Sequence, residues 1–373
     1  MIALFHAVCT SLKNLWYDKN ARSAMIVAIC IYALLYPQPY ANEVVRNVPI
    51  AVVDSDQSTA SREFLRRIDD TDSVAIHAAN DNLLAAQELF YAREVFGVVL
   101  VPAHFERDLL GGLPSSVAVF GDGGHFTLYQ SFSAAVRNAS QSLGTEVRIQ
   151  RLVSSGMDSN RAQSIVSPLE ITAVPLFNPH GGFATYILPA AFVLILQQTL
   201  LTGIGLLHAG RPQLKGLELI ASPLAYILLY LMWIVVTRLL VPAAYGISRV
   251  GDILPMLVVA LPFLTAVTAM GFALLRVFPT RASMMFFLLL QGLPLFFLSG
   301  ISWPTESIPD IIRLIALAVP STSATAAFVQ VDQLGATLHQ VLPSLKLLAV
   351  QTLLYGAIAV LPKRSKVAPT ALR

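Results

Sequence analysis

Few residues in this sequence have the types and spacing that catalysis or metal binding requires. The closest arrangement is Asp54-Ser55-Asp56, in which two carboxylates are separated by one residue, as in some paired acid/base sites. The pair directly follows the strand-like segment VPIAVVD (Val48–Asp54). Aspartates at such a strand end commonly accept hydrogen bonds from nearby backbone N–H groups. We therefore interpret Asp54 and Asp56 as turn residues rather than as a catalytic pair.

The other motifs that would indicate an enzyme or a metal protein are absent from the sequence. There is no Gly-Lys-Ser/Thr triplet to form a phosphate-binding loop, and no Gly-x-Ser-x-Gly. The seven histidines show neither His-x-His nor His-x-x-x-His spacing, which argues against a metal site. No basic cluster with interleaved aromatic residues indicates nucleic-acid binding. We expect no catalytic residue, no metal and no bound cofactor in this chain.

The composition is that of a membrane protein. Of the 373 residues, 55% are hydrophobic and only 13% are charged, about half of the soluble norm. Several apolar runs reach the ~20 residues that a helix needs to cross the ~30 Å hydrocarbon core. We predict a polytopic α-helical protein with six transmembrane helices, at residues 23–40, 182–207, 224–242, 253–275, 284–300 and 344–361.

Residues 41–181 form a polar block with the composition of a soluble domain. Strand-like segments alternate with helical ones, which predicts an α/β domain with one sheet. Strands are expected at 48–54, 73–78, 96–102, 115–124 and 169–179, and helices at 58–69, 82–93, 103–110 and 125–156. The fold class is therefore a bundle of transmembrane helices with an inserted extracytoplasmic α/β domain.

Three shorter segments complete the chain. Residues 1–22 are predicted to form an amphipathic helix lying in the membrane interface. The alternative, a signal peptide, is less favoured because the run Ser23–Tyr40 is longer than a usual signal-peptide core and lacks a small-x-small exit. Residues 301–343 are interrupted by Pro304, Pro309 and Pro320 and should form a re-entrant-like hairpin in the outer leaflet. Residues 362–373 form a cytosolic tail.

Basic residues near the span ends set the orientation, because cytoplasmic loops carry the excess of Lys and Arg. With the N-terminus inside, eleven basic residues fall in cytosolic segments and only two or three in the short outer loops. We therefore expect a multi-pass protein of the bacterial inner (plasma) membrane, with both termini cytosolic and residues 41–181 periplasmic. The cytosolic set is Lys13, Lys19, Arg22, Arg211, Lys215, Arg276, Arg281, Lys363, Arg364, Lys366 and Arg373.

Polar residues inside the spans need partners in hydrocarbon. They could form helix–helix hydrogen bonds, or they could line a substrate path. Arg238 is the only charged residue well inside an apolar run, and we expect it to extend to the interface. No span contains Asp or Glu, which argues against coupling to protons or sodium and indicates that energy comes from another protein. The candidates for the path are Gln197, Gln198, Thr202, Thr265, Gln291 and Ser299.

This layout resembles the permease subunits of type-2 ATP-binding-cassette (ABC) exporters, in the subgroup with an α/β ectodomain between the first two spans. The resemblance covers nearly the whole chain. It rests on VPIAVVDSDQSTASREFLRRI (Val48–Ile68), VFGVVLVPAHFERDLLGGLPSSVAVFGDG (Val95–Gly123) and NPHGGFATYILPAAFVLILQQTLL (Asn178–Leu201). LKGLELIASPL (Leu214–Leu224) is similar to the inner coupling segment of the family, although the acidic, Arg-rich run that usually precedes this segment is reduced to HAGRPQ.

The resemblance implies a permease that pairs with a second permease, either a copy of this chain or a paralogue. A separate cytosolic ABC ATPase would bind ATP and Mg²⁺ and drive an amphiphilic cargo, such as a drug or a lipid, outward. A periplasmic adaptor and an outer-membrane channel are further possible partners, besides membrane lipids. The ATPase-coupling loop would comprise Leu214, Lys215, Gly216, Leu217, Glu218, Ser222 and Pro223.

Two other classes of protein fit the sequence less well. A membrane-anchored sensor or scaffold could bind a ligand with the polar domain, but it rarely needs five spans after that domain. A membrane enzyme such as an acyltransferase would need a buried His/Asp pair, which the spans lack. An ABC exporter permease is the function that the sequence favours.

Overall fold

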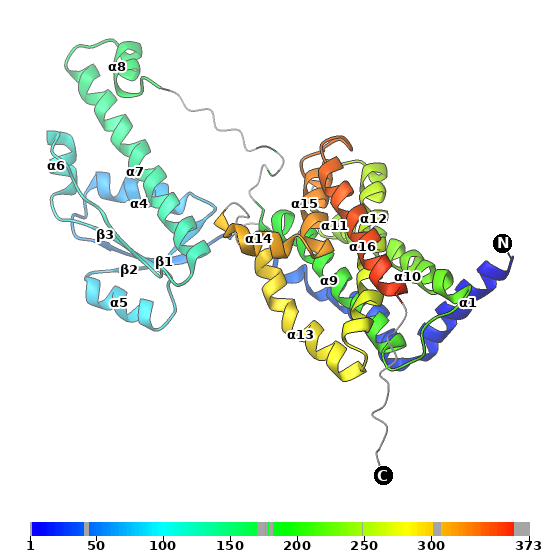
Figure 1. Cartoon of the computed structure of the whole chain (residues 1–373). Coiled ribbons are helices and arrows are strands. Elements are labelled where there is room, and N and C mark those ends of the chain that lie inside the picture. The colour runs from blue at the N-terminus through cyan, green and yellow to red at the C-terminus, as the bar shows by residue number, and fades with distance from the viewer. Residues whose placement is uncertain are drawn as a thin grey trace. The chain divides into compact units, whose positions relative to one another are not determined.

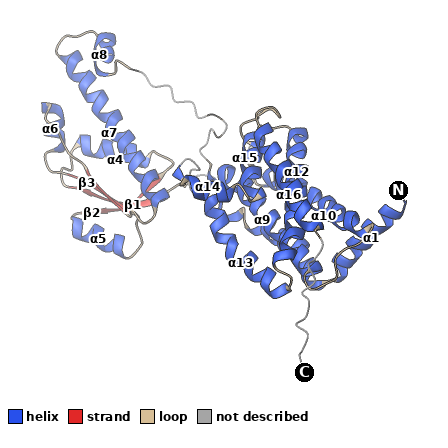
Figure 2. Cartoon of the chain, viewed as in Figure 1, coloured by secondary structure: helices blue, strands red, loops and turns tan. Residues whose placement is uncertain are grey.

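The structure is a computed structural model that describes residues 2–40, 45–169, 176, 178, 182–247, 249–300 and 307–361. The chain forms two compact units, which are described separately (Figure 1). The helical unit combines Met1–Glu43 with Pro175–Arg373, and the α/β unit is Val44–Val174. Figure 2 shows that the strands lie in the α/β unit and that the rest of the described chain is mostly helix.

Six helical segments among the described residues are long and apolar enough to cross a membrane. Two are continuous but contain a π-helical turn: Lys19–Tyr40 (α2 Lys19–Arg22, η1 Ser23–Val27, α3 Ala28–Leu35, η2 Gln38–Tyr40) and Glu218–Ala244 (α10 Glu218–Val235, η3 Val236–Leu240, α11 Val241–Ala244). The other four are α9 (Phe183–His208, apolar from Ile187), α12 (Ile253–Val277), α13 (Arg281–Leu298) and α16 (Leu342–Val360). Ahead of them, α1 (Ile2–Tyr17) packs Val8 and Leu15 into the same core as α10.

The helices α14 (Asp310–Ala316) and α15 (Pro320–Asp332) form a pair bent by 89°. With 13 residues, α15 is roughly 20 Å long and too short to cross the ~30 Å core alone. At the bend, Gln197 Oε1 accepts a hydrogen bond from the Ser321 N–H (2.9 Å), and Gln351 Nε2 donates to the Leu317 carbonyl (2.7 Å). The Tyr355 hydroxyl donates to the Ala318 carbonyl. Side chains of α9 and α16 thus satisfy the non-helical backbone at the tip, as hydrocarbon surroundings require.

Arg238 differs from the prediction. Its side chain is 2% exposed and forms an ion pair with Asp332 at the end of α15 (Nη1–Oδ2 3.1 Å), while the guanidinium lies 4.2 Å from the centre of the Phe328 ring. The expectation that Arg238 extends to the interface is therefore wrong. The carboxylate that holds it lies 94 residues away in the sequence, in the predicted hairpin 301–343 rather than in a predicted span.

The α/β unit is a four-stranded sheet with helices on both faces, in the strand order β2-β1-β3-β4. The strands are β1 (Val48–Asp54), β2 (Val74–Asn80), β3 (Gly97–Val101) and β4 (Ala118–Gly121). β1 pairs in parallel with β2 and with β3, where Val52 lies opposite Val99, and β4 is antiparallel to β3. The central strand β1 is buried on both faces, which explains its nearly continuous run of apolar residues.

The alternation of side chains along β1 separates two cores. Ile50 and Val52 face α4 (Thr59–Asp69), α6 (Phe105–Gly111) and the long α7 (Phe126–Ser154), whereas Ala51 and Val53 face α5 (Leu83–Tyr91). Figure 1 shows α5 on one side of the sheet and α4 and α7 on the other. The short α8 (Ser159–Val166) packs against α7.

The predicted order of strands and helices between residues 48 and 156 is confirmed by the structure. Ser58, expected at a helix start, accepts a hydrogen bond from the Ser61 N–H and caps α4. The strand at 115–124 is shorter than predicted, because only Ala118–Gly121 pairs with β3. The strand expected at 169–179 lies almost entirely outside the described residues.

Candidate functional site: the loop before α10 and the cavity beside it

The loop that joins α9 to α10 consists of residues 209–217 and is shorter than the interval 208–223 between the predicted spans. Gly210 (φ 76°) and Gly216 (φ 55°) adopt left-handed backbone conformations that glycine tolerates without strain. The helix α10 begins at Glu218, so Glu218, Ser222 and Pro223 of the expected coupling loop lie on its first turns. Pro223 has no N–H to donate, yet the helix continues through it.

Most of the expected coupling residues are accessible. Lys215, Gly216 and Glu218 are exposed, and neither charged side chain forms a hydrogen bond or an ion pair with another residue that the structure describes. Leu217 and Ile220 expose 42% and 59% of their surface beside them. An exposed apolar surface flanked by free charges is typical of a surface that contacts another molecule.

Four contacts attach the loop and its flanks to other segments. The Gly210 N–H donates to the Pro279 carbonyl (2.8 Å) in the turn between α12 and α13. Arg211 forms an ion pair with Asp18 (3.5 Å), which caps α2. The other two contacts are Ser222 with Ser11 of α1 (Oγ–Oγ 3.1 Å) and His208 Nε2 with the Tyr226 hydroxyl (2.8 Å). A displacement of the loop would therefore act on several helices at once.

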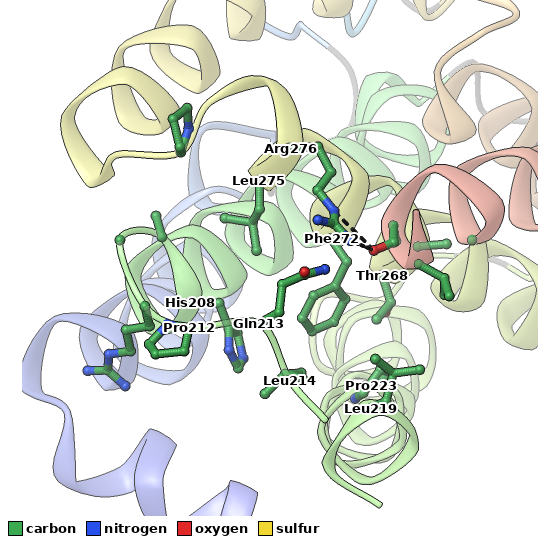
Figure 3. Close-up of a pocket in the computed structure, with 18 of the residues that line it drawn as sticks. His208, Pro212, Gln213, Leu214, Leu219, Pro223, Thr268, Phe272, Leu275 and Arg276 are labelled. Carbon is green, nitrogen blue, oxygen red and sulfur yellow. Dashed lines mark hydrogen bonds between the residues drawn. The ribbon is translucent and has the colours of Figure 1, made fainter. Parts of the chain in front are cut away.

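A cavity of about 310 Å³ lies between this loop and the helices α10, α12 and α16 (Figure 3). Its walls are mainly apolar and include Leu219, Ile227, Phe272 and Leu275. Figure 3 shows Gln213 extending from the loop into the pocket. The loop residues 209–214 therefore form one wall of this cavity as well as the connection to α10.

Two polar groups in the wall of the cavity retain unused hydrogen-bonding capacity. Arg276 donates through Nε (3.1 Å) and Nη2 (2.6 Å) to the Ala359 carbonyl of α16, while its Nη1 is buried without a partner among the described residues. The hydroxyl of Thr268 is likewise buried and unpaired within the described part of the chain. Buried donors without partners are uncommon and call for an explanation.

The six residues predicted for a substrate path do not converge on one place. Thr265 lines the cavity of Figure 3 and donates to the Pro262 carbonyl (2.9 Å). Gln198 and Thr202 line a second cavity, of about 490 Å³, between the first span, α9 and α13. Gln197 instead holds the bend before α15, as described above. The last two residues are Gln291 on α13 and Ser299 at its end. Gln291 Nε2 is buried and has no partner within the described ranges, and Ser299 donates to the Phe296 carbonyl (2.7 Å).

In the α/β unit, Asp54 and Asp56 form the turn that the sequence analysis inferred. Asp54 Oδ1 accepts hydrogen bonds from the backbone of Asp56 and Gln57, both at 3.0 Å, and Asp56 Oδ2 accepts one from the Glu106 N–H (2.9 Å). The hydrogen bond from Ser58, followed by the backbone of Glu106, lowers the pKa of Asp56. Among the described residues no group of three or more His, Cys, Asp or Glu could hold a metal ion.

Sequence reasoning missed the cavity beside the loop. Thr268 was visible as a polar residue within a span, and Arg276 only as a charge at a span end. Nothing in the sequence brings Gln213 and Phe272 to the same cavity, because both line it only through the way the loop packs beside α12.

The fold and the site together define a multi-pass membrane protein in which an exposed loop is attached to several spans. Comparison with family models matches residues 23–361 to the ABC-2 family transporter protein, and the chain belongs to this family. It is therefore the membrane permease component of an ABC transporter, and its family implies a partner ATPase component. Comparison with curated proteins and with solved structures finds no match.

Proposed function

We propose that this permease exports an amphiphilic cargo, a drug or a lipid-like molecule, outward across the bacterial inner membrane, driven by a separate ATPase. The observation that carries the proposal is the attachment of the exposed loop 209–217 to the turn after α12 and to the start of the first span. Force applied to Lys215 and Glu218 would be transmitted through Gly210 to Pro279 and through Arg211 to Asp18.

The orientation in this proposal places both termini and the loop in the cytosol and residues 41–181 in the periplasm. The contacts within the helical unit support the placement of four segments on the same side of the membrane. These are the loop 209–217, the junction of α1 and α2 at Asp18, the turn at Pro279 and the end of α16. This is the side that carries Lys13, Lys19, Arg22, Arg211, Lys215, Arg276 and Arg281. The excess of basic residues favours the cytosol for this side.

The nature of the cargo in the proposal follows from the second cavity. It lies between spans, and its lining is largely apolar with a few hydroxyl and amide groups, as a site for an amphiphile requires. We assign ATP and Mg²⁺ to the partner ATPase, and we expect a second permease, either a copy or a paralogue, to complete the transporter. The α/β unit would contact a periplasmic adaptor linked to an outer-membrane channel, the cargo, or the second permease.

The test is a charge reversal in the loop. In the double variant Lys215→Glu/Glu218→Lys, we expect co-purification of the ATPase and stimulation of ATP hydrolysis by the permease to fall at least tenfold, because the docking surface carries the opposite charges. The matched control is Glu88→Lys/Arg148→Glu, which reverses two exposed charges of the α/β unit and should leave both readouts unchanged. Normal co-purification and normal stimulation in the loop variant would refute the assigned docking surface.

A further inference from the structure

We propose that the cavity beside the loop is a binding site for a single-chain amphiphile with an anionic head group, of which a fatty acid is the simplest example. The site is separate from the cavity assigned to the cargo. Binding of the ligand there depends neither on export nor on the ATPase. Its lining residues come from the loop 209–214, α10, α12 and α16.

The walls suit an alkyl chain. Phe272 and Leu275 of α12 and Leu219 and Ile227 of α10 line the pocket, and α16 contributes Gly356 and other small or aliphatic residues. A cavity of about 310 Å³ lies at the lower end of the ~300–1,000 Å³ range of small-molecule sites. This size favours one chain over the two chains of a phospholipid.

The charge of the site selects an anion. Two arginines, Arg211 and Arg276, are among the lining residues, and the described lining contains no Asp or Glu. Arg211 is already paired with Asp18 outside the lining, which leaves Arg276 as the free charge. Arg276 is the stronger candidate for contact with the head group, because its Nη1 is buried without a partner among the residues that the structure describes, while Nε and Nη2 are fixed on the Ala359 carbonyl. A carboxylate at Nη1 would satisfy this donor with a charge-assisted hydrogen bond.

A second unpaired group lies further along the same helix. Thr268 precedes Arg276 by eight residues, which corresponds to roughly 12 Å along α12. Thr268 lines the cavity, and its buried hydroxyl has no partner in the described part of the chain. The axis from Arg276 to Thr268 therefore defines the direction in which the ligand would lie, with its head at Arg276.

Occupancy of this site would also stiffen the loop. Gln213 and Leu214 of the loop line the same cavity as residues of α12 and α16. A ligand in contact with both walls would hold residues 209–214 against the spans. The same residues lead directly to the exposed Lys215 and Glu218.

Photocrosslinking tests the site directly. The full-length protein in nanodiscs of phosphatidylcholine is labelled with a diazirine derivative of palmitate, with oleate or oleyl alcohol as competitor, and the adducts are mapped by mass spectrometry. We expect adducts on the peptides that contain Phe272 and Gly356. Oleate should compete at least tenfold more effectively than oleyl alcohol, because only oleate carries the anion.

Three variants separate the parts of the site. Arg276→Gln should weaken labelling about tenfold, whereas Arg281→Gln, a nearby exposed arginine outside the lining, should not. Gly356→Leu should abolish labelling by filling the cavity; a Cβ at this position meets no atom within 4 Å, so the fold should accept the change. Ala269→Phe fills the cavity from α12 and should also abolish labelling. This second variant keeps the test valid if Gly356→Leu fails to fold.

The proposal is overturned if adducts appear only outside the lining, if oleyl alcohol competes as well as oleate, or if Arg276→Gln and both filled variants label like the wild type. None of these measurements contains the ATPase. A failure of the coupling experiment above would therefore leave this inference intact, and the reverse also holds.

Discussion

Arg238 and Asp332 form an ion pair whose two side chains are almost completely removed from solvent, at 2% and 3% exposure. The second oxygen of Asp332 accepts a hydrogen bond from Arg249 (2.9 Å), so one carboxylate holds two arginines. The cluster joins the π-helical turn at the end of α10, the segment before α12 and the end of α15. Asp332 thus fixes the end of α15 to the spans, in addition to the contacts that hold the bend.

We predict that Asp332→Asn lowers the free energy of unfolding by about 3–5 kcal/mol, because it leaves two guanidinium groups without their counter-charge in a buried site. Unfolding by SDS in mixed micelles measures the change. The matched control is Asp310→Asn, which removes an exposed i,i+3 pair with Arg313 and should cause no measurable change. Equal stability of the two variants would contradict the role assigned to Asp332.

The sequence was sufficient for the elements whose signals are local. Periodicity, capping residues and apolar length predicted the strands and helices between residues 48 and 156. The run VPIAVVD, for example, is buried on both faces of the sheet. The length of the apolar runs likewise predicted the segments that the structure shows as long helices. The observed ends differ from the predicted ones by a few residues; α10, for example, begins at Glu218 rather than at residue 224.

The sequence was insufficient where polar groups distant in the chain meet. The pairing of Arg238 with Asp332 spans 94 residues, and the contact of Gln197 with Ser321 spans 124. No local pattern encodes such contacts, because each residue alone is also compatible with an interface or a substrate path. The cavity beside the loop has the same origin, since its walls come from three helices and a loop.

Gln197 illustrates how such a contact can be tested. We predict that Gln197→Leu lowers the free energy of unfolding by about 1–3 kcal/mol, because the Ser321 N–H loses its acceptor in a buried setting. Unfolding in mixed micelles is again the measurement. Thr202→Val on the same helix is nearly isosteric and removes no hydrogen bond to the described residues, so it serves as the control and should change stability little. Equal losses in the two variants would show that the contact at Ser321 contributes nothing.

The last prediction concerns acid stability at Asp122, which connects β4 to α7. His125, the Gly124 N–H and Arg93 hold this carboxylate and lower its pKa from 3.8 to about 2. A carboxyl whose pKa is lower in the folded state stabilises the fold above its ordinary pKa, and this contribution is lost as the pH falls through about 2. Hydrogen exchange of the full-length protein at the first turn of α7 should therefore lose protection between pH 4 and about 2. Asp122→Asn should be less protected at pH 5 and nearly independent of pH over that interval. A wild-type protein whose protection is constant down to pH 2 would refute the assignment.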